Sequence, residues 1–569
     1  MAEQVERAAE AAGAAGAASA AQAGAPQAAE LVLKSSAVFS GYVSEPYAGG
    51  VAIAGGKILA AGTEEELAPY IGPETEVRDY GDRLIMPGFN DSHTHFTQGA
   101  LVDDPDFCIP VGATASLDEA LTRVKAFADA HPDNEWVFGT QVIQFMWDVP
   151  LMPTAAQIDA VIPDRPVVLV QVDLHTYSAN TAAMRKVGIT RDTPDPYGGE
   201  ILHDEAGEPT GVFSNEGGSF FTQSIYKPAW EDMKRSYRKG FEKTKRLGLT
   251  TVCVVFPEGV NYEDPFEVFR EFELDGELPF HMPFYTELVG PDLIGKIERL
   301  QQKYNAAGSE ITCNGFKILI DGVCSDHTAW LSWPYADDAS TCGSPAMDLT
   351  QVREDLLAAC EAGYPVRIHT IGDAAVHWCL DAFDEARRRF GDKGLRHVQE
   401  HVETIQPADI QRFAEIGVVT CVQPMHMLLD LEFCAKDAAV GPERLPYCWA
   451  FRSLLDAGTH LALSTDFPVV ELDPLHEVYA AVTRQLFDGT PEEPWVGEQR
   501  ITMAEALSAY TLGSAYCEGF EDKLGTLEAG KAADVIVLSR DLFRLDDPRE
   551  ILDTEVELTV FKGKVIYEK

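Results

Sequence analysis

Two histidines one residue apart are the part of the sequence with the clearest capacity for chemistry. His93 and His95 lie in the segment LIMPGFNDSHTHF, residues 84–96. If this segment is a strand, side chains at i and i+2 leave the same face, so both imidazoles point to one place. Neutral imidazoles are common metal ligands, although a lone HxH pair is a weak signal. The pair is therefore a half-built metal site whose other ligands the chain must supply.

Four further candidate ligands lie within or near the ends of separate apolar, β-rich runs. They are Lys317 in GFKILID, His369 in PVRIHT, His401 in RHVQEH and Asp466 in LALSTD. A single strand histidine is more often a core residue and an aspartate beside a proline is often a turn residue, so none of these identifies a site alone. Lys317 differs, because a lysine in an apolar strand is costly to bury unless it is paired or modified. Together with the HxH pair, these side chains predict a site for one or two divalent metal ions.

The runs that carry these residues belong to a longer series of predicted strands. Eight β-rich runs, most of them separated by segments of helical pattern, cover residues 85–95, 249–256, 280–287, 315–321, 365–370, 396–401, 418–423 and 461–466. Strands that alternate with helices are typical of βα units, and eight units predict an α/β fold with a (β/α)8 TIM-like barrel. Functional residues of such barrels lie at the C-terminal ends of the strands. The six candidates lie on five of the eight strands, most of them near that end.

Both ends of the chain predict short strands that cannot form a domain separately. Residues 30–84 and 520–569 show short apolar runs with glycine turns, and we expect them to pair into one composite β-sandwich beside a barrel of residues 85–519. A long insertion, about residues 97–248, follows the first barrel strand. Insertions after barrel strands emerge at the catalytic face, so this one is expected to cover the active site. Residues 1–29 are Ala/Gly-rich and predict a disordered extension.

The composition is that of a folded protein with a strongly acidic surface. Hydrophobic residues make up 46% of the chain, and 45 Lys+Arg against 91 Asp+Glu give a formal net charge of -46. Such a charge disfavours nucleic acid and anionic membranes as partners. The 11 cysteines include no CxxC pair, which argues against a disulfide framework and a thiolate zinc site. Because no run of 18 apolar residues and no signal-peptide pattern occurs, we expect a cytoplasmic protein, with a homodimer as the default assembly.

Several segments taken together resemble one family of enzymes. PGFNDSHTH, GFKILIDG, RIHTIGDAA, RHVQEH and LSTDFP occur in this order, and LHTYSANTAAMRKVGIT, HTAWLSWPYADD and GTLEAGKAADVIVL add to the likeness, which spans about residues 31–569. They resemble the amidohydrolase superfamily, and most closely its YtcJ-like branch, the amidohydrolase 3 family. The resemblance implies a metal-dependent hydrolase on a (β/α)8 barrel.

The resemblance also implies a role for each candidate ligand. His93 and His95 look like ligands of the deeper metal, His369 and His401 like ligands of a second metal, Lys317 like a carboxylated bridging lysine, and Asp466 like a ligand and proton shuttle. Such ligands suit zinc, which lowers the pKa of bound water to about 7 and supplies a hydroxide at neutral pH. Asp466 would take the proton of that water and return it to the leaving nitrogen. An unmodified Lys317 and a single-metal site stay open.

The substrate and its pocket are less determined. We expect a small-molecule substrate whose C–N bond, in an amide, N-acyl or N-formyl group, is cleaved; the alternatives are an ester, lactone or cyclic amide substrate, and a non-catalytic barrel that binds or regulates. The pocket candidates, some of them by the resemblance, are Trp147, His175, Tyr177, Asn180, Asp321, His327 and Trp330. Leu174 departs from the branch, where a glycine is expected before His175, and restricts the backbone there.

Acidic residues close to the ligands in sequence form a last group of candidates. Asp91, Asp321, Asp373 and Glu400 each stand within a few residues of a predicted ligand. Because metal-binding imidazoles commonly donate their second N–H to a carboxylate, these residues could orient the histidines, although capping and turn roles fit equally well.

Overall fold

The eight predicted barrel strands form one parallel sheet. A computed structural model describes residues 27–144, 147–171, 176–196, 199–225, 228–255, 265–290, 292–433 and 435–569. The strands are β6 (Phe89–Thr94), β13 (Leu249–Val255), β14 (Met282–Glu287), β15 (Ile311–Leu319), β16 (Val366–Thr370), β17 (Val398–His401), β18 (Val419–Val422) and β19 (Leu461–Leu463). Each strand pairs with the next in this order. The two outer strands, β6 and β19, are linked where they end, since the backbone N–H of Asp466 donates to His93 O at 2.9 Å, so the barrel is nearly closed.

The barrel strands are recognisable in the sequence because they are buried on both faces. Every residue of β13 and of β18 is buried. Helices cover parallel sheets from outside and side chains fill the barrel from inside, so such strands are nearly continuous apolar runs. The helices around the barrel are α8 (Trp230–Arg246), α9 (Glu267–Leu274), α10 (Leu293–Tyr304), α11 (Leu349–Ala362), α12 (Asp373–Phe390), α13 (Ile410–Ile416), α14 (Pro424–Phe433), α15 (Ala435–Val440), α16 (Phe451–Asp456), α17 (Pro474–Thr483), α18 (Met503–Ser508) and α19 (Ser514–Glu518).

The start of the first barrel strand differs from the prediction. The sequence run 85–95 is divided at Gly88 into β5 (Leu84–Pro87), which belongs to another sheet, and β6, which opens the barrel. A Cβ on Gly88 would lie 2.2 Å from Oγ1 of Thr250, so only glycine permits this close approach. The boundary predicted between residues 84 and 85 therefore lies at Gly88.

Strands from the two ends of the chain share that other sheet. Its members are β1 (Leu31–Val38), β2 (Tyr47–Ala54), β3 (Lys57–Gly62), β4 (Glu76–Asp79), β5, β20 (Val535–Leu538), β21 (Val556–Phe561) and β22 (Lys564–Glu568). The two ends meet where β5 pairs antiparallel with β20. The two-layer sandwich stays a prediction. Of the predicted N-terminal extension, residues 1–26 lie outside the described residues, and Ala29 is already packed, with its N–H bonded to Tyr70 O at 2.7 Å.

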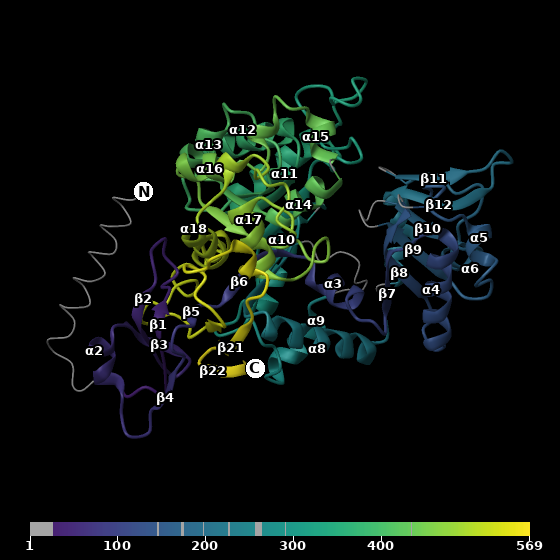
Figure 1. Ribbon diagram of the computed structural model, residues 1–569. Helices are drawn as coiled ribbons and strands as arrows, with labels where there is room; N and C mark the ends of the chain where they lie inside the picture. Colours follow the sequence, from purple (N-terminus) through teal and green to yellow (C-terminus); the bar gives the residue numbers. More distant parts are fainter. Residues whose placement is uncertain are drawn as a thin grey trace.

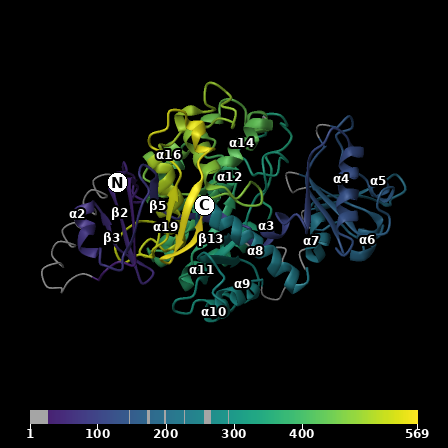
Figure 2. The same ribbon diagram turned by 60° about the horizontal axis from the view of Figure 1, so that its bottom comes forward.

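The insertion after β6 contains a third sheet of six strands. They are β7 (Cys108–Ala113), β8 (Val137–Ile143), β9 (Val167–Gln171), β10 (Thr176–Ala179), β11 (Gly199–His203) and β12 (Pro209–Asn215). Helices α3 (Phe96–Val102), α4 (Leu117–Ala130), α5 (Ala155–Asp159), α6 (Thr181–Val187) and α7 (Ser219–Ile225) accompany it. In both views it lies beside the barrel, with the terminal sheet on the other side (Figures 1 and 2). Among the described helices, none has both the length and the apolar character that crossing a membrane requires.

A largely buried imidazole between two carboxylates joins the terminal sheet to the barrel. His281, just before β14, places Nε2 2.9 Å from Asp534 and Nδ1 2.5 Å from Glu310. Burial alone would lower the pKa of His281, but the two carboxylates outweigh it and raise the pKa to about 9. The folded pKa exceeds the unfolded value of about 6.5, so this contribution to stability is complete below pH 6.5 and disappears as the pH rises through 9.

We therefore expect His281→Gln to lower the thermal unfolding midpoint most at pH 6 and hardly at all near pH 10. The rise of the His281 pKa from 6.5 to about 9 corresponds to roughly 3 kcal/mol of stability that the protonated imidazole adds at low pH. Midpoints of the wild type and the variant, measured in parallel across this pH range, check the prediction. A difference between the two proteins that does not change with pH would contradict it.

Candidate active site

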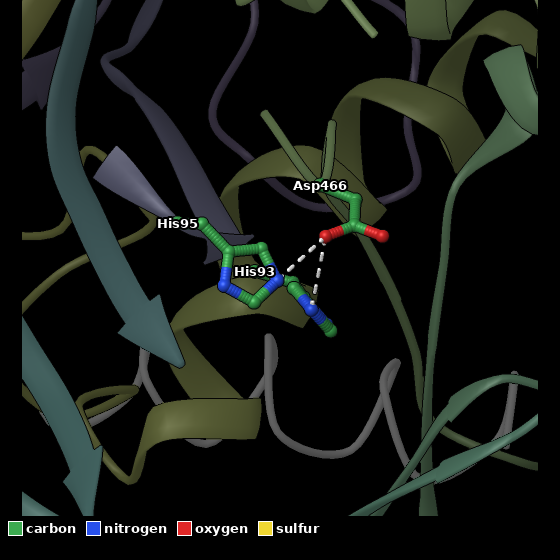
Figure 3. Close-up of side chains that lie close together, drawn as sticks. All are labelled: His93, His95 and Asp466. Carbon is green, nitrogen blue, oxygen red and sulfur yellow. Dashed lines mark ion pairs between the residues drawn. The ribbon is translucent and has the colours of Figure 1, made fainter. Parts of the chain in front are cut away.

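Three of the predicted ligands meet where β6 and β19 end. Asp466 Oδ1 lies 3.3 Å from Nε2 of His93 and 3.1 Å from Nε2 of His95, as Figure 3 shows. His93 is almost fully buried, whereas the side chain of His95 is 23% exposed. Burial alone would raise the pKa of Asp466, but the two imidazoles outweigh it and hold the pKa well below its usual range. The carboxylate is thus ionised and faces both histidines.

The backbone places Asp466 there at a conformational cost. Asp466 has φ 61° and His401 has φ 70°, in the left-handed region that non-glycine residues seldom occupy. Asp91, at the middle of β6, accepts hydrogen bonds from the N–H and the hydroxyl of Thr465, at 3.1 and 2.7 Å. Strained residues persist where the surroundings hold them, and they cluster at functional sites. Asp91 therefore positions Asp466 through its neighbour, and among the described residues it contacts no imidazole.

Glu400 fulfils the predicted orienting role for His93. Its Oε2 lies 2.8 Å from His93 Nδ1, and its Oε1 accepts a hydrogen bond from Arg367 at 2.5 Å. Arg367 also donates to the carbonyl of Ser92 and lies over the ring of Tyr285. Because Glu400 occupies Nδ1, the Nε2 atom of His93 stays directed at Asp466.

His401 lies beside His93 and His369, and the charge of Lys317 acts on His369. The ring of His401 lies 4.5 Å from that of His369 and 5.1 Å from that of His93. Burial, together with Lys317, lowers the pKa of His369 to about 3, and burial with His369 puts the pKa of His401 well below its usual range. Burial also lowers the pKa of Lys317. The structure thus favours neutral imidazoles and a less basic amine, the states that bind a metal or react with CO2.

The donor set fits a divalent cation. Lys317 Nζ is buried and has no hydrogen-bond partner in the part of the chain that the structure describes. Buried polar atoms without partners are rare and call for an explanation such as an ion. His93, His95 and Asp466 offer ligand atoms within 4.8 Å of one another.

The loop after β15 contains three of the predicted pocket residues. Asp321 is buried and accepts backbone hydrogen bonds from Trp330, Ile371 and Gly372, and its Oδ1 lies 3.9 Å from His369 Nε2. Trp330 is half-buried, and His327 pairs with Asp337 at 2.9 Å. Asp321 therefore ties this loop to the end of β16 beside a candidate ligand. The other acidic candidate, Asp373, binds the hydroxyl and N–H of Ser332 and contacts no imidazole that the structure describes.

The pocket candidates in the insertion have structural contacts. Trp147 is buried in the separate core of the insertion, and its indole N–H donates to Thr114 at 3.0 Å. Asn180 caps α6 and holds backbone groups of the insertion with both amide atoms. These four bonds use its full hydrogen-bonding capacity. Tyr177 packs its ring against Gly218. His175 lies outside the described residues.

The structure brings a further histidine, not predicted from the sequence, to the site. His426 lies on α14, and its Nε2 is 3.7 Å from Asp466 Oδ2. His426 belongs to a helix, whereas the six predicted ligands lie in or next to strands. In the sequence, His426 could have been found from the segment QPMH, which begins at the last residue of the seventh predicted strand.

The sequence profile described as the Amidohydrolase family matches residues 76–567 of this chain. The chain belongs to this family. The putative amidohydrolase YtcJ of Bacillus subtilis (strain 168) is 28% identical over 90% of this chain and 95% of its own length. The N-substituted formamide deformylase of Arthrobacter pascens is 27% identical over 91% of this chain and 95% of its own. The predicted YtcJ-like branch is thereby confirmed.

A solved structure agrees with the amidohydrolase assignment over almost the whole chain. An uncharacterized metal-dependent hydrolase from Pyrococcus furiosus is 26% identical, with a TM-score of 0.70, and covers 90% of this amidohydrolase and 100% of its own chain. The predicted TIM-like α/β fold is confirmed. The protein is an enzyme, a hydrolase, with a site whose donors fit a divalent metal.

Proposed function

We propose that this amidohydrolase cleaves a C–N bond of a small molecule, in an amide, N-acyl or N-formyl group, with zinc as its metal. The observation that carries the proposal is Asp466, whose two carboxylate oxygens lie between imidazoles from different barrel strands. The relative named N-substituted formamide deformylase supports the class of bond. The solved relative named a metal-dependent hydrolase supports the metal.

The six residues proposed to hold one or two zinc ions are His93, His95, Lys317, His369, His401 and Asp466. Imidazole nitrogens and carboxylate oxygens are donors that zinc binds in proteins. When bound, zinc lowers the pKa of a water molecule and polarises a carbonyl. The low pKa values of His369 and His401 favour that binding, because neutral imidazoles offer a lone pair without first losing a proton.

Asp466 is proposed to carry the proton of the reaction. Its pKa is held low by His93 and His95, so it enters the reaction ionised and can accept a proton from water. It then returns this proton to the leaving nitrogen, which departs as an amine. Its side chain is only 8% exposed, which limits loss of the proton to bulk solvent.

The pocket is proposed to be formed by the insertion together with the loop after β15. Asp321 holds that loop against the end of β16, and Trp330 is attached to it through its backbone N–H. Side chains of this loop and of the insertion would then select the acyl group and the amine.

A hydrolysis screen on zinc-loaded enzyme tests the class of bond. The substrates are N-formyl amines, N-acyl amino acids, cyclic amides and matched esters, and the readout is the amine or alcohol released. We expect turnover of a C–N substrate that is lost on chelation and restored by zinc. Turnover of esters alone would overturn the proposed bond, and chelator-resistant turnover would overturn the metal.

Carboxylation of Lys317 has its own expected result. A neutral amine adds CO2 and loses a proton, which converts a buried cation into an anionic ligand that two metals can share. We expect metal-free enzyme to bind zinc about tenfold more tightly in bicarbonate buffer than in CO2-free buffer. Zinc equivalents and recovered activity are measured in both buffers. Lys317→Gln is the control and should show no bicarbonate effect; equal recovery of the wild type in both buffers would contradict carboxylation.

A further inference from the structure

His426 faces the side of Asp466 opposite to His93 and His95. Oδ1 of Asp466 contacts the HxH pair, whereas Oδ2 lies 3.7 Å from His426 Nε2 and 4.0 Å from His401 Nδ1. The rings of His401 and His426 are nearly parallel, at 13°, with centroids 5.8 Å apart. His426 Nε2 is buried and has no hydrogen-bond partner among the residues that the structure describes. It is thus an imidazole nitrogen directed into the site without a partner.

A buried cation and a carboxylate stand behind His426, in the same order as behind His93 but with a longer contact to the imidazole. Behind His93, a series of contacts runs from Arg367 through Glu400 to the imidazole. Glu400 accepts a hydrogen bond from Arg367 at 2.5 Å and lies 2.8 Å from Nδ1 of His93. Behind His426, the corresponding series runs from Lys436 through Glu403 to the imidazole. Glu403 accepts a hydrogen bond from Lys436 at 2.5 Å, and its other carboxylate oxygen lies 3.6 Å from Nδ1 of His426.

All four charged members of these two series are buried. Ionised groups are seldom buried unless they are paired and perform a task. In both series a carboxylate lies on the Nδ1 side of the ring, at 2.8 Å from His93 and 3.6 Å from His426, and Nε2 faces one oxygen of Asp466. Such carboxylate–imidazole pairs are typical of histidines that bind metals.

The backbone also fixes the start of α14. The N–H of Met425 donates to Oε2 of Glu477 on α17 at 2.8 Å, and the N–H of His426 donates to Gln423 O at 3.1 Å. Oε1 of the same Gln423 lies 2.7 Å from His401 Nδ1 and accepts its N–H hydrogen bond, so Nε2 is the nitrogen of His401 that can bind a metal. One residue thus positions both His401 and His426.

We propose that His426 is a metal ligand, which forms a second metal position together with His401 and Oδ2 of Asp466. The three residues offer ligand atoms within 4.8 Å of one another. Zinc with bonds of 2.0–2.2 Å in tetrahedral geometry places its donors roughly 3.3–3.6 Å apart, close to the 3.7 Å between His426 and Asp466. The inference rests on the proposed function, since it adds a donor to the same metal centre. Glu403 and Lys436 act as positioning residues for this ligand.

The test measures metal binding directly. Full-length enzyme is stripped with a chelator and titrated with zinc and, in parallel, with cobalt(II), whose visible absorption reports its ligands. For the wild type we expect two equivalents. His426→Ala should weaken one of them by more than about 100-fold and change the cobalt spectrum, and Glu403→Gln should weaken the same equivalent by about 10- to 100-fold. Circular dichroism of the stripped proteins shows whether each variant is folded.

His377→Gln is the matched control. His377 is also paired with a carboxylate, Asp409 at 3.0 Å, but it is 47% exposed and lies on α12. It should bind metal as the wild type does. If folded His426→Ala keeps the stoichiometry, affinity and cobalt spectrum of the wild type, the inference is overturned while the proposed function stands. A wild-type enzyme that binds no metal would overturn both.

Discussion

Asp466→Asn is expected to lower kcat by about 10²- to 10⁴-fold while metal stays bound, because the amide keeps one oxygen toward the imidazoles but cannot accept a proton. The carboxylate contacts His93 and His95, which hold its pKa below the usual range, so it is the side chain best placed to move a proton within the site. Steady-state kinetics on the best substrate of the screen, with zinc equivalents determined on the same sample, measure both quantities.

Asp381→Asn is the control for this substitution. Asp381 lies on α12, is half exposed and pairs with Arg412 instead of with a residue of the site. It should keep wild-type kinetics. A metal-loaded Asp466→Asn enzyme with near wild-type kcat would show that another group carries the proton. Loss of metal together with activity would show that Asp466 acts mainly as a ligand.

Glu400→Gln is expected to destabilise the fold by about 3–5 kcal/mol, the cost of leaving one partner of a buried ion pair without the other. Glu400 and Arg367 are both fully buried, and Glu400 also holds Nδ1 of His93. Because metal binding adds stability to the folded state, urea unfolding is measured on chelated protein, followed by tryptophan fluorescence.

The double variant Arg367→Met, Glu400→Gln distinguishes the effect of an unpaired buried charge from the effect of altered packing. The double variant leaves no unpaired charge in the interior, so it should recover much of the stability that the single variant loses. A single variant as stable as the wild type would mean that the Arg367 charge is compensated elsewhere. Metal affinity should stay reduced in both variants, because His93 loses its carboxylate.

The barrel and its candidate ligands could be predicted because parallel strands leave a strong record in sequence. Strands such as β13 are buried throughout, so they appear as apolar runs, and the C-terminal ends of such strands converge on one mouth. A histidine that interrupts the end of such a run, such as His369 or His401, is therefore noticeable. The family resemblance assigned roles to the same residues independently.

For residues outside the strands, the sequence contains no comparable pattern that indicates their roles. Asn180 was expected to line the pocket, but its amide holds the backbone of the insertion. His426 was not noticed, because a single histidine in an apolar helix resembles a core residue until its neighbours are known. The end of the terminal sheet at Pro87 and the start of the barrel at Phe89 were joined in one run, because apolar residues continue across Gly88.

The sequence by itself indicated the family, the eight strands and the six candidate donors, because burial and strand ends are local properties that residue types reflect. Only the tertiary structure decided which oxygen of Asp466 faces which imidazole, and which buried cation supports each carboxylate. Those pairings join residues far apart in the chain, such as Glu400 with His93 at a separation of 307 positions. Their formation depends on how the barrel closes, and no spacing along the sequence encodes that geometry.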